Sequence, residues 1–115
     1  MADIEKLAEL VIKFRDARDW KQFHNPKDEA ISLALEAAEV LEHFQWKSKE
    51  EIEDYIKTHK SEIAEELADV LYWVFLVGKD LDIDLSDAFV KKMDKNNKKY
   101  PVEKAKGKHT KYTRL

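Results

Sequence analysis

The chain has 115 residues, of which 39% are charged and 43% apolar, with only two glycines and two prolines. This composition predicts one small, nearly all-helical domain. The formal net charge of -3 gives no positive field for attracting a nucleic acid, and the lack of cysteine excludes disulfides, thiolate metal sites and cysteine nucleophiles. The acidic first residues and the short apolar run 70–77 fit neither a signal peptide nor a membrane span, so we expect a cytoplasmic protein without a membrane partner.

Two amphipathic helices are predicted in the first part of the chain. Apolar residues at steps of three and four, beginning with Ile4, predict a helix from about Asp3 to Arg18. Asn25 is a suitable N-cap and Pro26 suits the first helical position. A second helix is therefore expected from Pro26 to about Phe44.

The middle of the chain predicts a short helix followed by a long one. Ser48 and Glu51 have the spacing of a capping box, which opens a short helix lying outside the main bundle. A third long helix is expected over residues 61–78. Its second half is apolar on all sides, which is typical of a helix buried by neighbours or by a second subunit.

The last part of the chain predicts a fourth helix and a basic tail. Asp84 is a suitable N-cap, and the helix should end near Tyr100 because the residue before Pro101 resists the helical conformation. Residues 102–115 contain five Lys or Arg and one Glu, so we expect a mobile or peripherally docked tail. The predicted organisation is a helical domain over residues 1–101 and a tail over 102–115.

Two carboxylate pairs with matching sequence context are the most informative feature. Glu36 and Glu39 lie in one apolar helical stretch, and Glu66 and Asp69 repeat the pattern 30 residues later. Residues three apart share a helix face, so two facing helices could direct four carboxylates at one point. In apolar surroundings these charges need cations to neutralise them. All-oxygen ligands favour Mg2+ first and Mn2+ second, and such sites commonly act on phosphate esters and anhydrides.

The carboxylate pairs have two other possible roles. They could be the solvated faces of surface helices, but each pair is flanked by Ala, Val and Leu and lacks Lys or Arg partners. A di-iron bundle needs Glu-x-x-His motifs, and none of the four histidines has a Glu three residues before it. The pattern therefore favours a magnesium site.

Several separated motifs are similar to those of one enzyme family. The two carboxylate motifs, together with RDWKQFH, FQWK, EELADVLYW and KMDKNNKKYP, resemble the MazG-type nucleoside triphosphate pyrophosphohydrolases, in particular the single-domain dCTP pyrophosphatase branch. The resemblance covers about residues 18–100, with an echo at 111–113. It implies a four-helix MazG-like bundle with a short extra helix, assembled as a homodimer or a dimer of dimers. It also implies Mg2+-dependent hydrolysis of a deoxynucleoside triphosphate, dCTP-like first, to the monophosphate and pyrophosphate as a house-cleaning activity.

The resemblance also assigns roles to individual residues. The four carboxylates would be the catalytic metal ligands, with Mn2+ as a substitute for Mg2+. The predicted substrate site has two further parts. A stripe on the fourth helix would bind phosphate and sugar oxygens through Lys92, Asn96 and Tyr100. Aromatic and imidazole side chains would surround the base, and these are Trp20, His24, Trp46 and Trp73.

Two departures from the family pattern bear on substrate choice. Leu35 precedes Glu36 where the family often has a second Glu, and Trp73 stands where the dCTP pyrophosphatases tend to have tyrosine. The tryptophan leaves the base and sugar preference open, so one alternative is a related pyrophosphohydrolase for dATP, dUTP or phosphoribosyl-ATP. A separate alternative is a non-catalytic helical protein whose acids pair with a basic partner helix.

Overall fold

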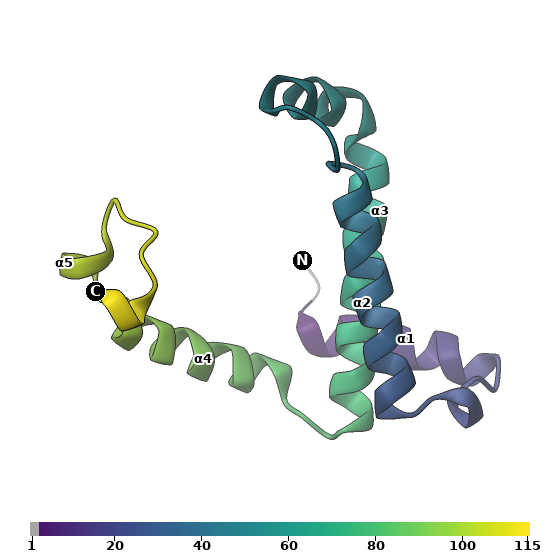
Figure 1. Ribbon diagram of the computed structural model, residues 1–115. Helices are drawn as coiled ribbons and strands as arrows, with labels where there is room; N and C mark the ends of the chain where they lie inside the picture. The colour runs from purple at the N-terminus through teal and green to yellow at the C-terminus, as the bar shows by residue number, and fades with distance from the viewer. Residues whose placement is uncertain (1–2) are drawn as a thin grey trace. The chain divides into compact units, whose positions relative to one another are not determined.

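The structure is a computed structural model that describes residues 3–115. The regular structure in this range is entirely helical, which confirms the predicted all-α class. The chain forms two compact units, one ending at Ile83 and the other spanning Asp84–Leu115 (Figure 1). The first contains α1 (Ile4–Ala17), the 3-10 helix η1 (Lys21–Phe23), α2 (Pro26–Glu42) and α3 (Lys49–Asp80), and the second contains α4 (Leu85–Lys99), α5 (Val102–Ala105) and the 3-10 helix η2 (Tyr112–Arg114).

The helices of the first unit begin at side-chain caps that are readable in the sequence. Asp3 accepts a hydrogen bond from the backbone N–H of Lys6 at 2.9 Å, and Asn25 accepts one from Asp28 at 2.9 Å. Such caps satisfy backbone donors that have no partner inside the helix. Both α1 and α2 pack on α3, and α2 lies alongside α3 (Figure 1).

The predicted short helix and third helix are in fact one continuous helix, α3, of 32 residues. The capping box at Ser48 and Glu51 is present as expected. The predicted break near residues 57–60 was wrong because the segment Lys-Thr-His-Lys is polar but contains neither glycine nor proline. Polarity alone does not interrupt the backbone hydrogen bonds of a helix. At 1.5 Å per residue, α3 is about 48 Å long.

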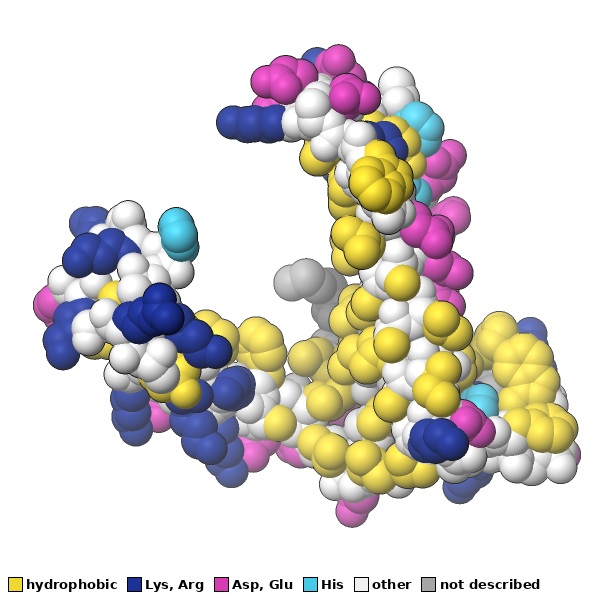
Figure 2. Space-filling view, viewed as in Figure 1, with side chains coloured by type: hydrophobic (Ala, Val, Ile, Leu, Met, Phe, Trp, Pro, Cys, Tyr) yellow, Lys and Arg dark blue, Asp and Glu magenta, His cyan; other side chains and the backbone are white. Residues whose placement is uncertain are grey.

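The hydrophobic core of the described chain is small. Ala8 and Val11 of α1 are buried with Phe75 and Leu76 of α3. Many larger apolar side chains of the first unit are exposed, and Figure 2 shows hydrophobic side chains running along α2 and α3. The exposed apolar side chains of the first unit include Leu10 and Phe14 of α1, Ile31, Leu35 and Leu41 of α2, and Leu67 and Leu71 of α3. Contiguous apolar surface of this kind typically marks an association surface.

The second unit consists of α4 and the segment that follows it. Asp84 caps α4 by accepting a hydrogen bond from the backbone N–H of Asp87 at 3.0 Å, as predicted. The basic segment after Pro101 contains α5 and η2. Tyr112 of η2 packs edge-on against Tyr100, with ring centroids 5.8 Å apart, so this tail docks on the end of α4. The proposed division at residue 101 stays a prediction.

None of the helices described over residues 3–115 is both long enough and apolar enough to cross a lipid bilayer.

Candidate metal and nucleotide site

The structure brings three of the four predicted metal ligands together. Glu36 and Glu39 lie one turn apart on α2, and Glu66 faces them from α3. Each contributes a carboxylate oxygen to a cluster whose members all lie within 4.8 Å of one another. The cluster forms because α2 and α3 pack side by side with their Glu-x-x-Glu and Glu-x-x-Asp faces opposed.

The electrostatics of this cluster suit a cation. Hydrogen bonding with Glu39, burial and the surrounding negative charges raise the pKa of Glu66 to about 7. Burial raises the pKa of Glu36, aided by a hydrogen bond with Glu39 and by the charges of Glu39 and Asp69. One buried oxygen each of Glu36 and Glu66 accepts no hydrogen bond from residues 3–115. Unpartnered carboxylate oxygens are the ligands that a hard divalent cation requires, so these residues fit such an ion.

A cavity of about 480 Å³ adjoins the carboxylates. Its walls come from α1, α3 and the segment around η1, namely Val11, Phe14, Trp20, His24, Asp69, Tyr72 and Trp73. The rings of His24 and Trp73 meet edge to face at 5.5 Å, and those of Phe14 and Trp20 at 5.6 Å. Asp69 lies beside the three-glutamate cluster and also lines this aromatic cavity, so it joins the two parts of the site.

Trp46 lies apart from the other predicted base-pocket residues. It is 91% exposed, and its backbone has a φ of 68° in the turn that connects α2 to α3. His24 precedes α2 and Trp46 follows it, so the 17-residue helix separates them by about 25 Å. The aromatic cavity of one chain is therefore built from Trp20, His24 and Trp73 without Trp46.

The predicted phosphate-binding residues belong to the second unit. Lys92 and Asn96 lie one turn apart on α4, and Tyr100 is its C-terminal cap residue. The Lys92 side chain is exposed and Asn96 is half-buried, with its amide nitrogen 3.9 Å from the sulfur of Met93. These three residues share a helix stripe, as the sequence predicted.

A sequence profile of the MazG-like family matches residues 31–115. The chain belongs to the MazG-like family. Among its relatives, mouse (Mus musculus) dCTP pyrophosphatase 1 is 36% identical over 114 residues, covering 97% of this chain and 67% of the relative. The human (Homo sapiens) dCTP pyrophosphatase 1 is 34% identical over the same proportions of both chains. The crystal structure of a pyrophosphatase from Archaeoglobus fulgidus superimposes with a TM-score of 0.81 at 38% identity, covering 88% of this chain and 94% of that one.

Three walls of the cavity in this MazG-like chain were not predicted as site residues. Val11 and Phe14 belong to the apolar stripe of α1, and Tyr72 is next to Trp73. Tyr72 lies three residues after Asp69, so helical spacing could have placed it near the carboxylates. Phe14 gave no such signal, because a core residue and a pocket residue look alike in an amphipathic pattern.

Proposed function

We propose that this MazG-like chain is a Mg2+-dependent nucleotide pyrophosphohydrolase that converts a deoxynucleoside triphosphate, dCTP-like first, to the monophosphate and pyrophosphate. The proposal rests chiefly on one observation: a cluster of carboxylates with unpartnered buried oxygens opens onto an aromatic cavity through Asp69. The relatives described as dCTP pyrophosphatases support the reaction and the first choice of base. A house-cleaning role and a cytoplasmic location follow from this activity as expectations.

The four carboxylates have the central role in the proposed reaction. Glu36, Glu39, Glu66 and Asp69 would hold Mg2+, which when bound offsets the substrate's negative charge and makes a bound water more acidic. Glu36 or Glu39 would accept the proton of the attacking water, since each contributes a carboxylate oxygen to the cluster. The raised pKa of Glu66 means that this cluster holds a proton near neutral pH until a cation replaces it.

The aromatic cavity is proposed to hold the nucleobase. Trp20, His24 and Trp73 present ring faces and edges on which a base can stack. The cavity of about 480 Å³ lies in the size range of small-molecule sites. Lys92, Asn96 and Tyr100 are proposed to bind phosphate and sugar oxygens, for which a cation, an amide and a phenol are suitable partners.

We further propose that the active form is a homodimer or homotetramer. The exposed apolar side chains of α2 and α3 supply an association surface, and Trp46 lies too far from the aromatic cavity of its own chain to touch the same base. Trp46 would thus complete the base pocket of a second copy. Mixing inactive E39Q with inactive W46A would restore activity in mixed oligomers, whereas no recovery after subunit exchange would contradict the shared site.

The activity itself is tested by pyrophosphate release. Purified protein is incubated with Mg2+ and a panel of standard and modified deoxynucleoside triphosphates, with phosphoribosyl-ATP included. We expect release from the wild type, loss in Glu39→Gln, and retention in the matched control Glu42→Gln, an exposed glutamate of the same helix. The preferred substrate identifies the base. Absence of turnover across the panel would refute the proposed reaction and favour a binding role for the acids.

A further inference from the structure

A second set of charged side chains joins the three helices of the first unit at the end away from Trp46. Arg15 of α1 donates two hydrogen bonds to Asp80 of α3, at 2.7 and 2.8 Å. Glu29 of α2 lies beside this pair. Arg15 is 2% exposed and Glu29 is 1% exposed, so both ionisable side chains are shielded from water.

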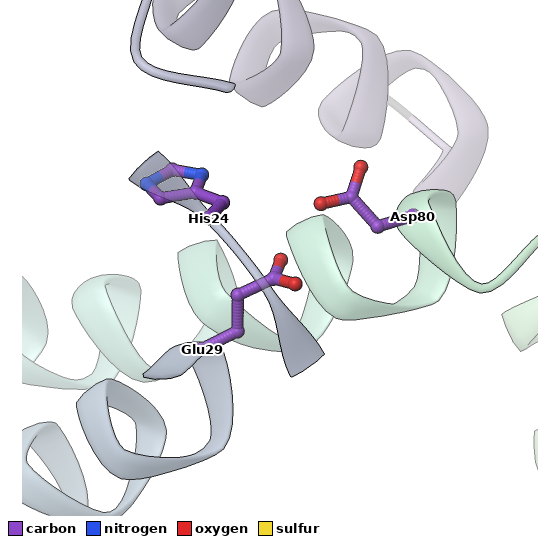
Figure 3. Close-up of side chains that lie close together, drawn as sticks. All are labelled: His24, Glu29 and Asp80. Atoms are coloured by element: carbon purple, nitrogen blue, oxygen red, sulfur yellow. The ribbon is translucent and has the colours of Figure 1, made fainter. Parts of the chain in front are cut away.

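Glu29 points into the space between Asp80 and His24 (Figure 3). One ring nitrogen of His24 and one carboxylate oxygen of each acid all lie within 4.8 Å of one another. The Nδ1 atom of His24 and the Oε2 atom of Glu29 are both buried and have no hydrogen-bond partner within residues 3–115. Buried polar atoms are costly when unsatisfied, so this arrangement calls for a proton, a water or a cation.

The surroundings favour a proton over a metal ion. Both oxygens of Asp80 are already bonded by the buried Arg15 guanidinium. Lys21 and Lys79 also line the adjoining cavity of about 320 Å³. Burial, a hydrogen bond with Asp80 and the Asp80 charge raise the pKa of Glu29 to about 7, with Arg15 opposing the shift. Glu29 therefore retains its proton in much of the population at neutral pH.

His24 lies between this cluster and the proposed base pocket and lines the cavities on both sides. Its ring lines the aromatic cavity and meets Trp73 edge to face at 5.5 Å. The same residue lines the smaller cavity over Glu29 and Asp80. A change at Glu29 therefore reaches the aromatic cavity through a single side chain.

We propose that Glu29 is a positioning residue whose carboxyl group, braced by the Arg15–Asp80 ion pair, holds the His24 ring against the base pocket. This inference rests on the proposed function for its effect on nucleotide binding. The claim that Glu29 fixes the position of the His24 ring does not depend on whether the protein hydrolyses nucleotides. Glu29 does not itself line the aromatic cavity.

Ionisation of Glu29 should release this arrangement. The ionised carboxylate of Glu29 repels Asp80 and no longer carries the proton that it shares with Asp80 in a hydrogen bond. Each element packed around Glu29 contributes charged or titratable groups that face it. They are Arg15 of α1, Lys21 and His24 of the η1 segment, and Lys79 and Asp80 of α3. When Glu29 ionises, its carboxylate is repelled by Asp80 and attracted to the cations Lys21 and Lys79, so its position beside His24 changes.

The first measurement follows nucleotide hydrolysis between pH 6 and 8 in the wild type, Glu29→Gln and the matched control Glu42→Gln. Glutamine keeps a hydrogen-bond donor and nearly the same volume but cannot ionise. With Mg2+ at saturation, so that Glu66 does not titrate, we expect KM to rise with pH in the wild type and in Glu42→Gln, and this rise to be lost in Glu29→Gln, with a smaller effect on kcat. An identical KM profile in all three proteins would overturn the link to the pocket.

The second measurement needs no turnover. The nuclear Overhauser effects (NOEs) between the His24 imidazole and Trp73 indole protons are measured at pH 6 and pH 8, with the His24 resonances assigned by their loss in His24→Gln. We expect these NOEs to weaken from pH 6 to pH 8 in the wild type and to stay constant in Glu29→Gln, with the NOEs between His43 and Tyr55 as an internal control. If no nucleotide is hydrolysed but this change is found and lost as expected, the proposed function fails and the positioning of His24 stands.

Two outcomes of the NMR experiment would overturn the inference. One is a pH dependence of the NOEs between His24 and Trp73 that is the same in the wild type and in Glu29→Gln. The other is broadening of the His24 resonances by Mn2+ that persists in Glu39→Gln/Glu66→Gln and is lost when Glu29→Gln is added, which would show that the cluster of His24, Glu29 and Asp80 binds a metal ion in place of a proton.

Discussion

Replacement of Arg15 by methionine tests the charged cluster most directly. The Arg15 side chain is 3% exposed and bonds both oxygens of Asp80, whose own side chain is 18% exposed. Methionine retains much of the apolar stem and removes the charge, which leaves two neighbouring acids without their cation. Breaking a buried ion pair by removing one partner costs about 3 to 5 kcal/mol. Because Asp80 has some access to water, we expect the lower end, about 3 kcal/mol.

This loss is a large fraction of the total stability. A chain of this length is expected to have an unfolding free energy of about 6 to 17 kcal/mol. The assay is urea unfolding at pH 7 and at one fixed protein concentration, because oligomerisation adds a concentration-dependent contribution. Lys13→Met, an exposed charge on the same helix, is the control and should change stability by less than about 0.5 kcal/mol.

The pH dependence of the Arg15→Met effect provides a second check. Although burial opposes it, hydrogen bonds from Arg15 and Glu29 keep the pKa of Asp80 below 3.8 in the wild type. A depressed carboxyl pKa stabilises the folded state above the unfolded pKa, and this contribution is lost as the pH falls. Without Arg15, Asp80 should bind a proton at higher pH, so the deficit should shrink as the pH is lowered from 7 towards 4. A cost below about 1 kcal/mol at pH 7, or a deficit that grows on acidification, would refute the reasoning.

Three further predictions concern the carboxylates and the core. In thermal scans without metal, Glu39→Gln should melt at a higher temperature than the wild type because the substitution relieves repulsion between carboxylates. Mg2+ at one hundred times its Kd should stabilise the wild type by about 2.7 kcal/mol, so that the wild type then melts at the higher temperature. If the variant gains as much from Mg2+ as the wild type, the cluster is not the metal site. The raised pKa of Glu29, about 7 against 4.5 for a free carboxyl, predicts that the unfolding free energy falls as pH rises between these values. Chemical unfolding of Glu29→Gln should show a flatter dependence, and equal slopes would contradict the raised pKa. Leu76 is 0% exposed, so Leu76→Ala should cost about 3 kcal/mol in urea unfolding, against less than about 1.5 kcal/mol for the volume-conserving Leu76→Met.

Local signals in the sequence were enough to locate most helix starts. Asn25, Ser48 and Asp84 each act through a hydrogen bond to a backbone group three residues away, so a short stretch of sequence contains the whole interaction. The carboxylate spacing was equally local within each helix. The opposition of α2 and α3 had to be assumed, and it is the structure that brings Glu66 to Glu36 and Glu39.

The features that sequence reasoning missed depend on distance along the chain. Arg15 and Asp80 are separated by 65 residues, and no periodic pattern links them. The sequence also groups Trp46 with His24 as base-pocket residues, which stays a prediction, but it does not show that a helix of 17 residues separates them within one chain. The length of α2 determines the distance between Trp46 and His24, and amino-acid composition does not indicate this distance.

The continuity of α3 also limits which changes in chain length the site can accept. Asp69 and Trp73 are four residues apart on this uninterrupted helix, which places them on the same face with a rise of about 6 Å between them. One inserted or deleted residue between them would rotate the indole by about 100° away from the carboxylate. The polar stretch near residue 58 is just as helical, but it lies before the site residues of α3, so a change of length there would leave their mutual register intact. Insertions between Glu66 and Trp73 should therefore be excluded, because they would break the alignment of the carboxylates with the aromatic cavity.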